Sequence, residues 1–166
     1  MPFYIIYMSR TYIDLDGVLD DFDLWLATKI GHVTHEPEEA YEVMVKYADE
    51  CFLDTKVITH TDAYFDMLKK DPNCYVLSAL SLPENLAPYC KDRTPEEICK
   101  IHKKNKIQWA VNHGIPREKV IICRCAEDKI NYCKPGDILY DDRRDTIKKW
   151  NDLGGIGIHV YNPYWG

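Results

Sequence analysis

Apolar residues along the chain alternate between the spacing of strands and the spacing of helices. Continuous or alternating apolar stretches predict strands at residues 9–15, 74–81, 119–124, 136–142 and 156–162. Apolar positions at helical spacing predict helices over 19–31, 37–50, 61–70, 94–114 and 143–155. The stretch 82–93 shows no clear period, so we expect a loop there. Strands that alternate with helices and lack a polar face predict an α/β fold, a Rossmann-like parallel sheet with helices on both faces.

Local signals predict several helix ends. Thr94 and Glu97 form a capping-box pattern around a proline in the first helical position. Pro37 has the same first-turn position in an earlier helix, and Gly31 is a candidate stop for the helix before it. Thr61 is placed to cap the third helix.

Acidic residues gather directly after the first predicted strand. Asp14 and Asp16 stand two positions apart, so on an extended chain they face the same way, and their ionised carboxylates would repel each other. A hard cation such as Mg²⁺ relieves that repulsion, because it takes oxygen ligands. The pair also suits phosphoryl transfer, with one carboxylate as nucleophile and its neighbour as general acid. Three further acidic residues are expected in the first turns of the next helix, where its dipole favours negative charge: Asp20, Asp21 and Asp23.

Other polar residues follow the remaining strands. The second strand leads to Ser78, the third precedes Lys129, and the fourth ends at Asp141 and Asp142. Ligands of parallel sheets bind beyond the carboxyl ends of the strands, so we expect these groups on one rim with Asp14. Adjacent residues of a strand point to opposite faces, and we therefore expect only one of Asp141 and Asp142 to bind a metal directly.

The DxDG pattern at residues 14–17 by itself leaves alternatives open. It also occurs as a simple acidic turn or as the start of a calcium loop. An EF-hand loop, however, would carry a further ligand where this chain has Val18.

Composition narrows the classes of function. The 166 residues suffice for one domain with a modest insertion, and a net charge of −6 disfavours stable binding to nucleic acid or to anionic membranes. The apolar run FYIIYM is too short to span a membrane and lacks signal-peptide features, so we expect a cytoplasmic protein. We expect the seven cysteines to be reduced thiols, as is usual in the cytosol. Cys123 and Cys125, or His32 and His35, could bind zinc. We favour the interpretation that the cysteines are inert thiols and the histidines ordinary loop residues.

Several motifs together resemble one family. DLDGVLDDF at 14–22 resembles the first motif of the haloacid dehalogenase (HAD) superfamily, and more narrowly of its 5′(3′)-deoxyribonucleotidase branch. VLSA at 76–79 is similar to the second motif, KIQWAVNHG at 106–114 to a lysine–tryptophan helix, and 137–155 to the fourth motif and its helix. The segment 51–68 resembles the exit from that branch's helical cap. The matches follow the family's order over nearly the whole chain.

The resemblance implies a fold and a set of roles. A HAD-like core would comprise residues 1–18 and 72–166, and a small helical cap, shorter than in the family's deoxyribonucleotidases, would comprise 19–71. Asp14 would be the nucleophile, and Asp16 the general acid and base. The phosphate would be held by Ser78 with the adjacent Ala79, and by lysine. Magnesium would be bound by Asp14, by the backbone carbonyl of Asp16 and by Asp142, with Asp141 beside it.

Two lysines are candidates for the cation that steadies the phosphate. Lys129 lies between the third and fourth strands, where the family's lysine belongs, and we favour it over an ordinary loop lysine. Lys106 is either a second cation near the site or one of four lysines on an exposed helix face (KIHKKNK). Phe22, Trp25 and Arg143 are candidates for the substrate pocket, although aromatic residues on amphipathic helices are more often core.

These features predict a Mg²⁺-dependent phosphomonoester hydrolase that forms an aspartyl-phosphate and acts on a nucleoside monophosphate. A 3′-phosphatase for nucleic-acid ends is an alternative, against which the acidic net charge weighs. A non-catalytic HAD-like binding module is another, but such a module would be expected to have lost a catalytic group. Whether the protein forms a homodimer stays open.

Overall fold

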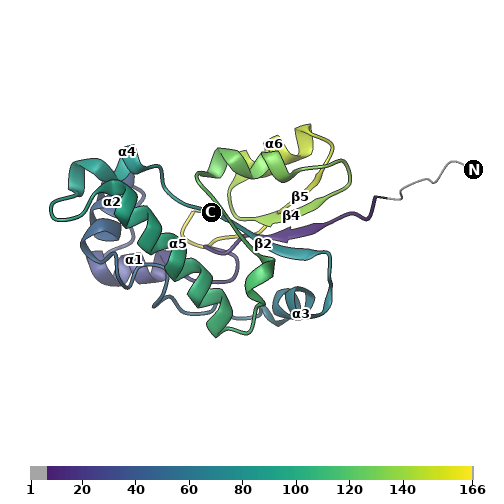
Figure 1. Ribbon diagram of the computed structural model, residues 1–166, viewed down its shortest axis with the longest axis horizontal. Coiled ribbons are helices and arrows are strands. Elements are labelled where there is room, and N and C mark those ends of the chain that lie inside the picture. Colours follow the sequence, from purple (N-terminus) through teal and green to yellow (C-terminus); the bar gives the residue numbers. More distant parts are fainter. Residues whose placement is uncertain (1–6, 166) are drawn as a thin grey trace, which may run out of the picture.

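The computed structural model describes residues 7–165, which form one five-stranded sheet (Figure 1). Residues 1–6, and with them most of the FYIIYM run, lie outside the described residues, as does residue 166. The strands are β1 (Thr11–Ile13), β2 (Cys74–Ala79), β3 (Val120–Cys123), β4 (Ile138–Asp141) and β5 (Ile156–His159). All neighbours pair in parallel, in the order β3-β2-β1-β4-β5. The order reverses beside β1, and ligands of such sheets bind at this point.

Helices cover both faces of the sheet (Figure 1). On one face lie α3 (Asp62–Lys70) and α5 (Pro95–Asn112), and on the other lies α6 (Arg144–Asp152). Strand side chains alternate accordingly: Ile13 packs in a cluster with Trp109 of α5, whereas Tyr12 packs with Trp150 of α6. The predicted α/β fold with a Rossmann-like parallel sheet is therefore confirmed.

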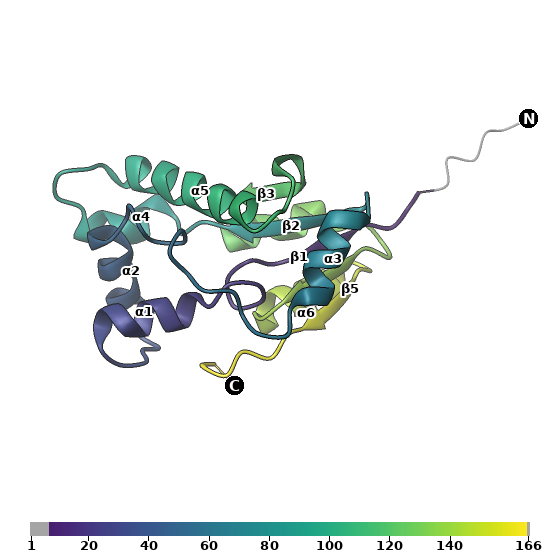
Figure 2. The same ribbon diagram turned by 90° about the horizontal axis from the view of Figure 1, so that it is seen from below.

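The remaining helices lie beyond the carboxyl ends of the strands (Figure 2). They are α1 (Phe22–Ile30), α2 (Pro37–Lys46) and the short α4 (Pro83–Leu86). Leu26 of α1 and Met44 of α2 share a cluster of their own with Phe52. Leu68 of α3, by contrast, is fully buried in the core of the sheet. The division into a core of 1–18 and 72–166 and a cap of 19–71 stays a prediction, and this packing leads us to propose α1 and α2 as the centre of the cap.

Most predicted helix ends agree with the structure. The capping box is present, because Thr94 Oγ1 accepts from the Glu97 amide at 3.1 Å and the Glu97 carboxylate accepts from the Thr94 amide at 3.0 Å. Gly31 ends α1 with a φ of 96°, which glycine adopts readily. The cap expected from Thr61 is wrong, since its hydroxyl donates to the Ile58 carbonyl instead.

The expected loop at 82–93 is also wrong in part. It contains α4 and the 3₁₀ turn η1 (Ala87–Tyr89), because Leu86 is fully buried against Ile98 of α5. Further 3₁₀ turns that the pattern did not reveal are η2 (Arg117–Lys119) and η3 (Ala126–Tyr132). The first strand is shorter than predicted. No helix among residues 7–165 combines the length and apolar character needed to cross a membrane.

The acidic residues after β1 separate into different environments. Asp21 caps α1 by accepting from the Leu24 amide at 3.1 Å, and Asp23 lies in its first turn, as expected. Asp20 was expected there too, but this prediction is wrong. The backbone folds into a tight turn after β1, with the Leu19 amide donating to the Leu15 carbonyl at 2.8 Å, and Asp20 is fully buried before the helix begins. Burial, reinforced by the charge of Asp16, raises the pKa of Asp20.

Candidate active site

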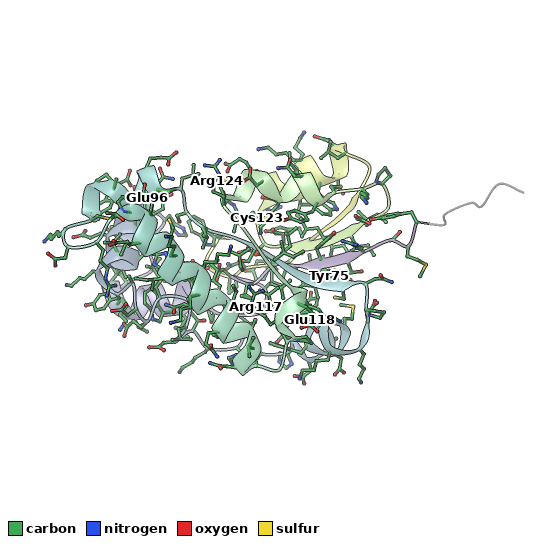
Figure 3. The ribbon with its side chains drawn as sticks, viewed as in Figure 1. Tyr75, Glu96, Arg117, Glu118, Cys123 and Arg124 are labelled. Carbon is green, nitrogen blue, oxygen red and sulfur yellow. The ribbon has the colours of Figure 1, made fainter. Side chains whose placement is uncertain are left out.

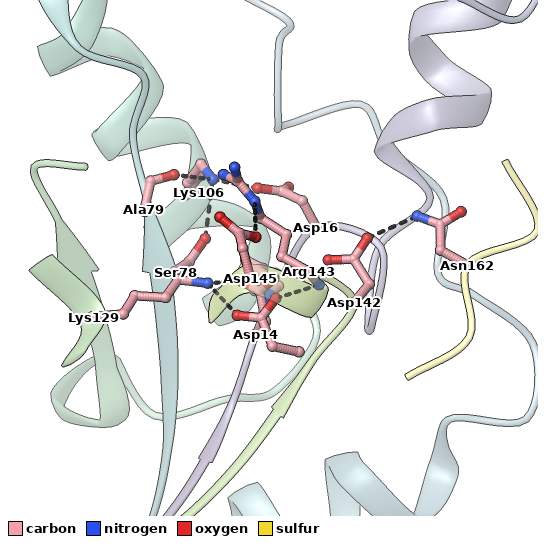
Figure 4. A network of polar contacts seen from close by, with 12 residues as sticks. Asp14, Asp16, Ser78, Ala79, Lys106, Lys129, Asp142, Arg143, Asp145 and Asn162 are labelled. Atoms are coloured by element: carbon pink, nitrogen blue, oxygen red, sulfur yellow. Dashed lines mark hydrogen bonds and ion pairs between the residues drawn. The ribbon is translucent and has the colours of Figure 1, made fainter. Parts of the chain in front are cut away.

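A cavity of about 680 Å³ lies between the carboxyl ends of the strands and helices α1 and α2. Charged groups occupy its floor on the side of the sheet: Asp14, Asp16, Lys106, Lys129 and Asp142. Aromatic and apolar side chains form much of its other wall, among them Phe22, Leu26, Tyr41, Met44, Phe52 and Trp165. Figure 4 shows the polar groups of the floor at close range. Of the predicted rim, Asp14, Lys129 and Asp142 line this cavity, whereas Ser78 and Asp141 are fully buried and do not line it.

Asp14 sits directly beyond β1 and is held firmly. Its amide donates to the Tyr140 carbonyl of β4 at 2.9 Å, and its Oδ1 accepts from the Leu15 amide at 2.8 Å. Burial and the negative charge of Asp141 raise the pKa of Asp14, while Lys129 opposes that rise. The carboxylate therefore depends on a nearby cation to stay ionised.

Lys129 is that cation in the structure. It lies in η3, is buried, and its Nζ is 3.0 Å from Asp14 Oδ1 and 2.7 Å from Asp141 Oδ2 (Figure 4). Burial disfavours its charge, but the two carboxylates outweigh this and raise the pKa of Lys129. The lysine that sequence reasoning favoured is thus in contact with the first aspartate of the motif.

Lys106 also reaches the floor, so its interpretation as an exposed helix lysine is wrong. It is 1 % exposed, and its Nζ contacts the Asp16 carboxylate, donates to Ser78 Oγ at 3.0 Å and donates to the Ala79 carbonyl at 2.9 Å. The ammonium also lies 4.1 Å from the centre of the Phe52 ring. α5 packs across the end of β2, so this one lysine of its helix points inward.

Asn105 helps to hold Phe52 over Lys106. Asn105, also on α5, donates to the carbonyls of Ala48, Asp49 and Cys51 at 3.0–3.1 Å. These bonds fix the turn that precedes Phe52. Phe52 itself has a positive φ of 66°. The aromatic wall and the cationic floor of the cavity are therefore held by adjacent residues of one helix.

Both aspartates at the end of β4 reach the cluster. One carboxylate oxygen each from Asp14, Asp141 and Asp142 lie within 4.8 Å of one another. Strand alternation does not separate Asp141 from Asp142, because β4 ends at Asp141 and the backbone bends at the next residue. That only one of them binds a metal directly stays a prediction. Burial raises the pKa of Asp142 to about 7, although a hydrogen bond from Asn162 lowers it. Within residues 7–165 this is the one group of three or more histidine, cysteine or acidic side chains gathered closely enough to share a metal.

Gly17 makes room for this cluster. Its φ is 80°, and a Cβ at this position would lie 2.1 Å from Asp142 Oδ2 and 2.9 Å from Asn162 Nδ2. Any other residue would therefore displace the Asp142 carboxylate. The glycine of the DxDG pattern is explained by this close approach.

The three predicted pocket residues have different positions. Phe22 and Arg143 line the cavity. Trp25 is not among the lining residues, and its buried ring packs behind Phe22 with centroids 5.9 Å apart. Sequence reasoning did not single out Phe52, Asn162 or Trp165 as site residues, because no local pattern marks them, and it considered His35 only as a zinc ligand.

The seven cysteines take no part in the cavity. All are free, and those most deeply buried belong to the apolar clusters, as Cys74 does beside β1. Burial raises the pKa of Cys74 and of Cys123 to about 11. Thiols with such raised pKa values are mostly protonated near neutral pH.

Comparisons with known proteins were made on the sequence and on the fold. The chain matches no protein-family model and no curated protein sequence. Among solved structures it resembles that of a HAD family enzyme from Bacteroides thetaiotaomicron, described as a magnesium complex. The two share 15% identity over 94% of each chain, with a TM-score of 0.48. Because that score lies below 0.5, the function of this chain has to be inferred from its own side chains.

Proposed function

We propose that the protein is a Mg²⁺-dependent phosphatase of the HAD type, which hydrolyses a small phosphomonoester through an aspartyl-phosphate on Asp14. One observation carries this proposal. Two carboxylates that leave the same strand, Asp14 and Asp16, each contact a different buried lysine at the floor of one cavity. Ion pairs that only stabilise a fold need not face an open cavity. Phosphoryl transfer, by contrast, needs carboxylates and cations together where the substrate binds.

The proposed chemistry has two steps. An oxygen of Asp14 attacks phosphorus, the bond from phosphorus to the ester oxygen breaks, and Asp16 gives a proton to the departing oxygen. Water then attacks the phosphorus, Asp16 takes a proton from it, and the bond to Asp14 breaks to release inorganic phosphate. Ser78 Oγ and Lys106 Nζ lie 3.0 Å apart, and in this proposal both hold the phosphoryl oxygens. Lys129 keeps Asp14 ionised for the attack.

The residues present fit a magnesium ion. Asp14, Asp141 and Asp142 offer a purely oxygen donor set within a small radius, which is the chemistry that Mg²⁺ prefers. Burial and the neighbouring carboxylates raise the pKa values of Asp14 and Asp142, and a bound cation would favour their ionised forms. The ion would be held by Asp14 and Asp142, with the Asp16 carbonyl and Asp141 beside it, and it would supply positive charge to the phosphoryl group.

We further propose a nucleoside monophosphate as the substrate. The cavity combines a cationic floor with an aromatic wall, in which Phe22 and Phe52 stack with centroids 4.9 Å apart and Tyr41 lies nearby. Aromatic side chains of this kind bind the flat face of a nucleobase. A volume of about 680 Å³ is ample for a nucleotide and falls within the usual range of small-molecule sites.

Phosphate release from a substrate panel tests the proposal. Purified protein would be incubated with and without Mg²⁺ against nucleoside 5′- and 3′-monophosphates, sugar phosphates and a 3′-phosphorylated oligonucleotide. We expect Mg²⁺-dependent release from a monophosphate, and none from Asp14→Asn, whose melting temperature stays close to that of the original. Asp152→Asn, at an exposed position of α6, is the matched control and should keep full activity. Absence of release from every compound would refute the proposal, and release from the oligonucleotide alone would favour an end-healing 3′-phosphatase.

A further inference from the structure

The segment that follows β5 returns to the candidate metal cluster. Asn162 is 3 % exposed, and its Nδ2 donates to Asp142 Oδ2 at 2.8 Å (Figure 4). The same nitrogen donates to Asp23 Oδ2 at 2.9 Å. We propose that Asn162 is a positioning residue of the metal centre, which holds the Asp142 carboxylate in place and links it to helix α1. This inference rests on the proposed function, since it assumes that Asp142 binds Mg²⁺.

The hydrogen bonds determine which way the amide of Asn162 points. Its Oδ1 accepts from the Tyr164 amide at 3.0 Å, while both hydrogens of Nδ2 go to carboxylates. A reversed amide would set its oxygen against Asp23 and Asp142 and would leave the Tyr164 amide facing a donor. The side chain is therefore fixed by three bonds and can act as a rigid support.

Asp142 needs such a support because the sheet does not hold it. It lies one residue beyond β4, and its backbone carbonyl accepts a hydrogen bond from His159 Nε2 at 3.0 Å. Its carboxylate lies close to the buried carboxylates of Asp14 and Asp141, which repel it. Asn162 donates to Asp142 Oδ2, and the backbone of Gly17 lies close to the same oxygen. Partners of this kind orient metal ligands and raise metal affinity.

The same segment also reaches the wall of the cavity. Trp165 Nε1 donates to Asp23 Oδ1 at 3.1 Å, and the Trp165 ring meets the His35 ring edge-on at 4.7 Å between centroids. Asp23 thus accepts from both Asn162 and Trp165. The chain beyond β5 therefore joins the metal cluster, the first turn of α1 and the aromatic wall into one unit.

Metal binding by two variants tests the proposal directly. Asn162→Ala removes all three bonds, whereas Asn162→Ser keeps an oxygen that can accept from the Tyr164 amide but cannot donate to both carboxylates. Mn²⁺ would be titrated into each protein and followed by the electron paramagnetic resonance of the free ion, with Mg²⁺ as competitor. Both variants should bind the metals about 10–100-fold more weakly than the original protein. Tyr161→Ala, 69 % exposed on the same segment, is the control and should bind them equally well.

Steady-state kinetics separates positioning from a general structural role. If Asn162 acts through Asp142, saturating Mg²⁺ restores the kcat of both variants and leaves the KM for the phosphomonoester unchanged. Unaltered metal affinity in the folded variants would overturn the proposal, as would a loss of kcat that Mg²⁺ does not restore. Unfolding of both variants would assign Asn162 to stability alone and would overturn it too. If the unsubstituted protein bound neither metal, the magnesium centre itself would fail, which is a separate and recognisable outcome.

Discussion

Lys129→Met is the substitution that most directly tests the electrostatics of the site. Methionine has a similar length and is apolar, so it fills the same space without the charge. Lys129 Nζ lies 3.0 Å from Asp14 Oδ1 and 2.7 Å from Asp141 Oδ2, and all three side chains are buried. The substitution therefore leaves two neighbouring carboxylates in the interior without the lysine that balances them.

The size of the effect follows from these distances. At an effective dielectric constant of about 20, each ion pair contributes roughly 6 kcal/mol of Coulomb attraction, most of which the desolvation of the three groups offsets. Removing one partner of a buried pair typically costs about 3–5 kcal/mol. Each carboxylate keeps one backbone donor, the Leu15 amide for Asp14 and the Arg143 amide for Asp141, which argues for the lower end of that range.

Urea denaturation followed by tryptophan fluorescence measures the change, because Trp109 and Trp150 are fully buried in the two halves of the core. In metal-free buffer near neutral pH, we expect Lys129→Met to lower the free energy of unfolding by about 3 kcal/mol. Lys148→Met is the matched control: its partner Asp152 lies 3.0 Å away on the surface of α6, and such pairs contribute less than about 0.5 kcal/mol. If Lys129→Met lowered the free energy of unfolding by as little as the control does, the reasoning would be refuted.

Three further predictions concern the floor of the cavity. Lys106→Met should lower kcat by about 10²–10³-fold, because it removes the charged donor that we propose for the phosphoryl group. Single-turnover kinetics would show the slower chemical step. The metal-free protein should lose stability as pH rises from about 4 to about 7. Burial raises the pKa of Asp142 from 3.8 to about 7, so in this range the folded protein binds a proton at Asp142 that the unfolded chain has already lost, and folding becomes less favourable as pH rises. Thermal melting across that range should show the decline, and saturating Mg²⁺ should abolish it. Gly17→Ala should weaken Mg²⁺ binding, measured by titration, because its Cβ would meet the Asp142 carboxylate.

Local chemistry accounts for the parts of the structure that could be predicted. The capping box at Thr94, the stop at Gly31 and the alternation of strands and helices depend on residues a few positions apart, so their patterns are visible along the chain. The same holds for the placement of Asp14 and Asp142 at strand ends, since parallel strands bring their carboxyl ends to one edge. Asp20 shows where this reasoning fails. Its charge suits a helix start, but the tight turn after β1 buries it before the helix begins.

The sequence by itself determined the sheet, its helices and the edge on which the acidic residues gather. These follow from hydrophobic periodicity and from helix-end signals, which act over short distances. The tertiary structure alone decided that Lys106 points inward, that Asp141 and Asp142 both join the cluster, and that Asn162 and Trp165 reach it from the far end of the chain. Those contacts join segments up to about 140 residues apart. The packing of α5 against β2 and the path of the chain beyond β5 bring these residues together. No local sequence pattern predicts either arrangement.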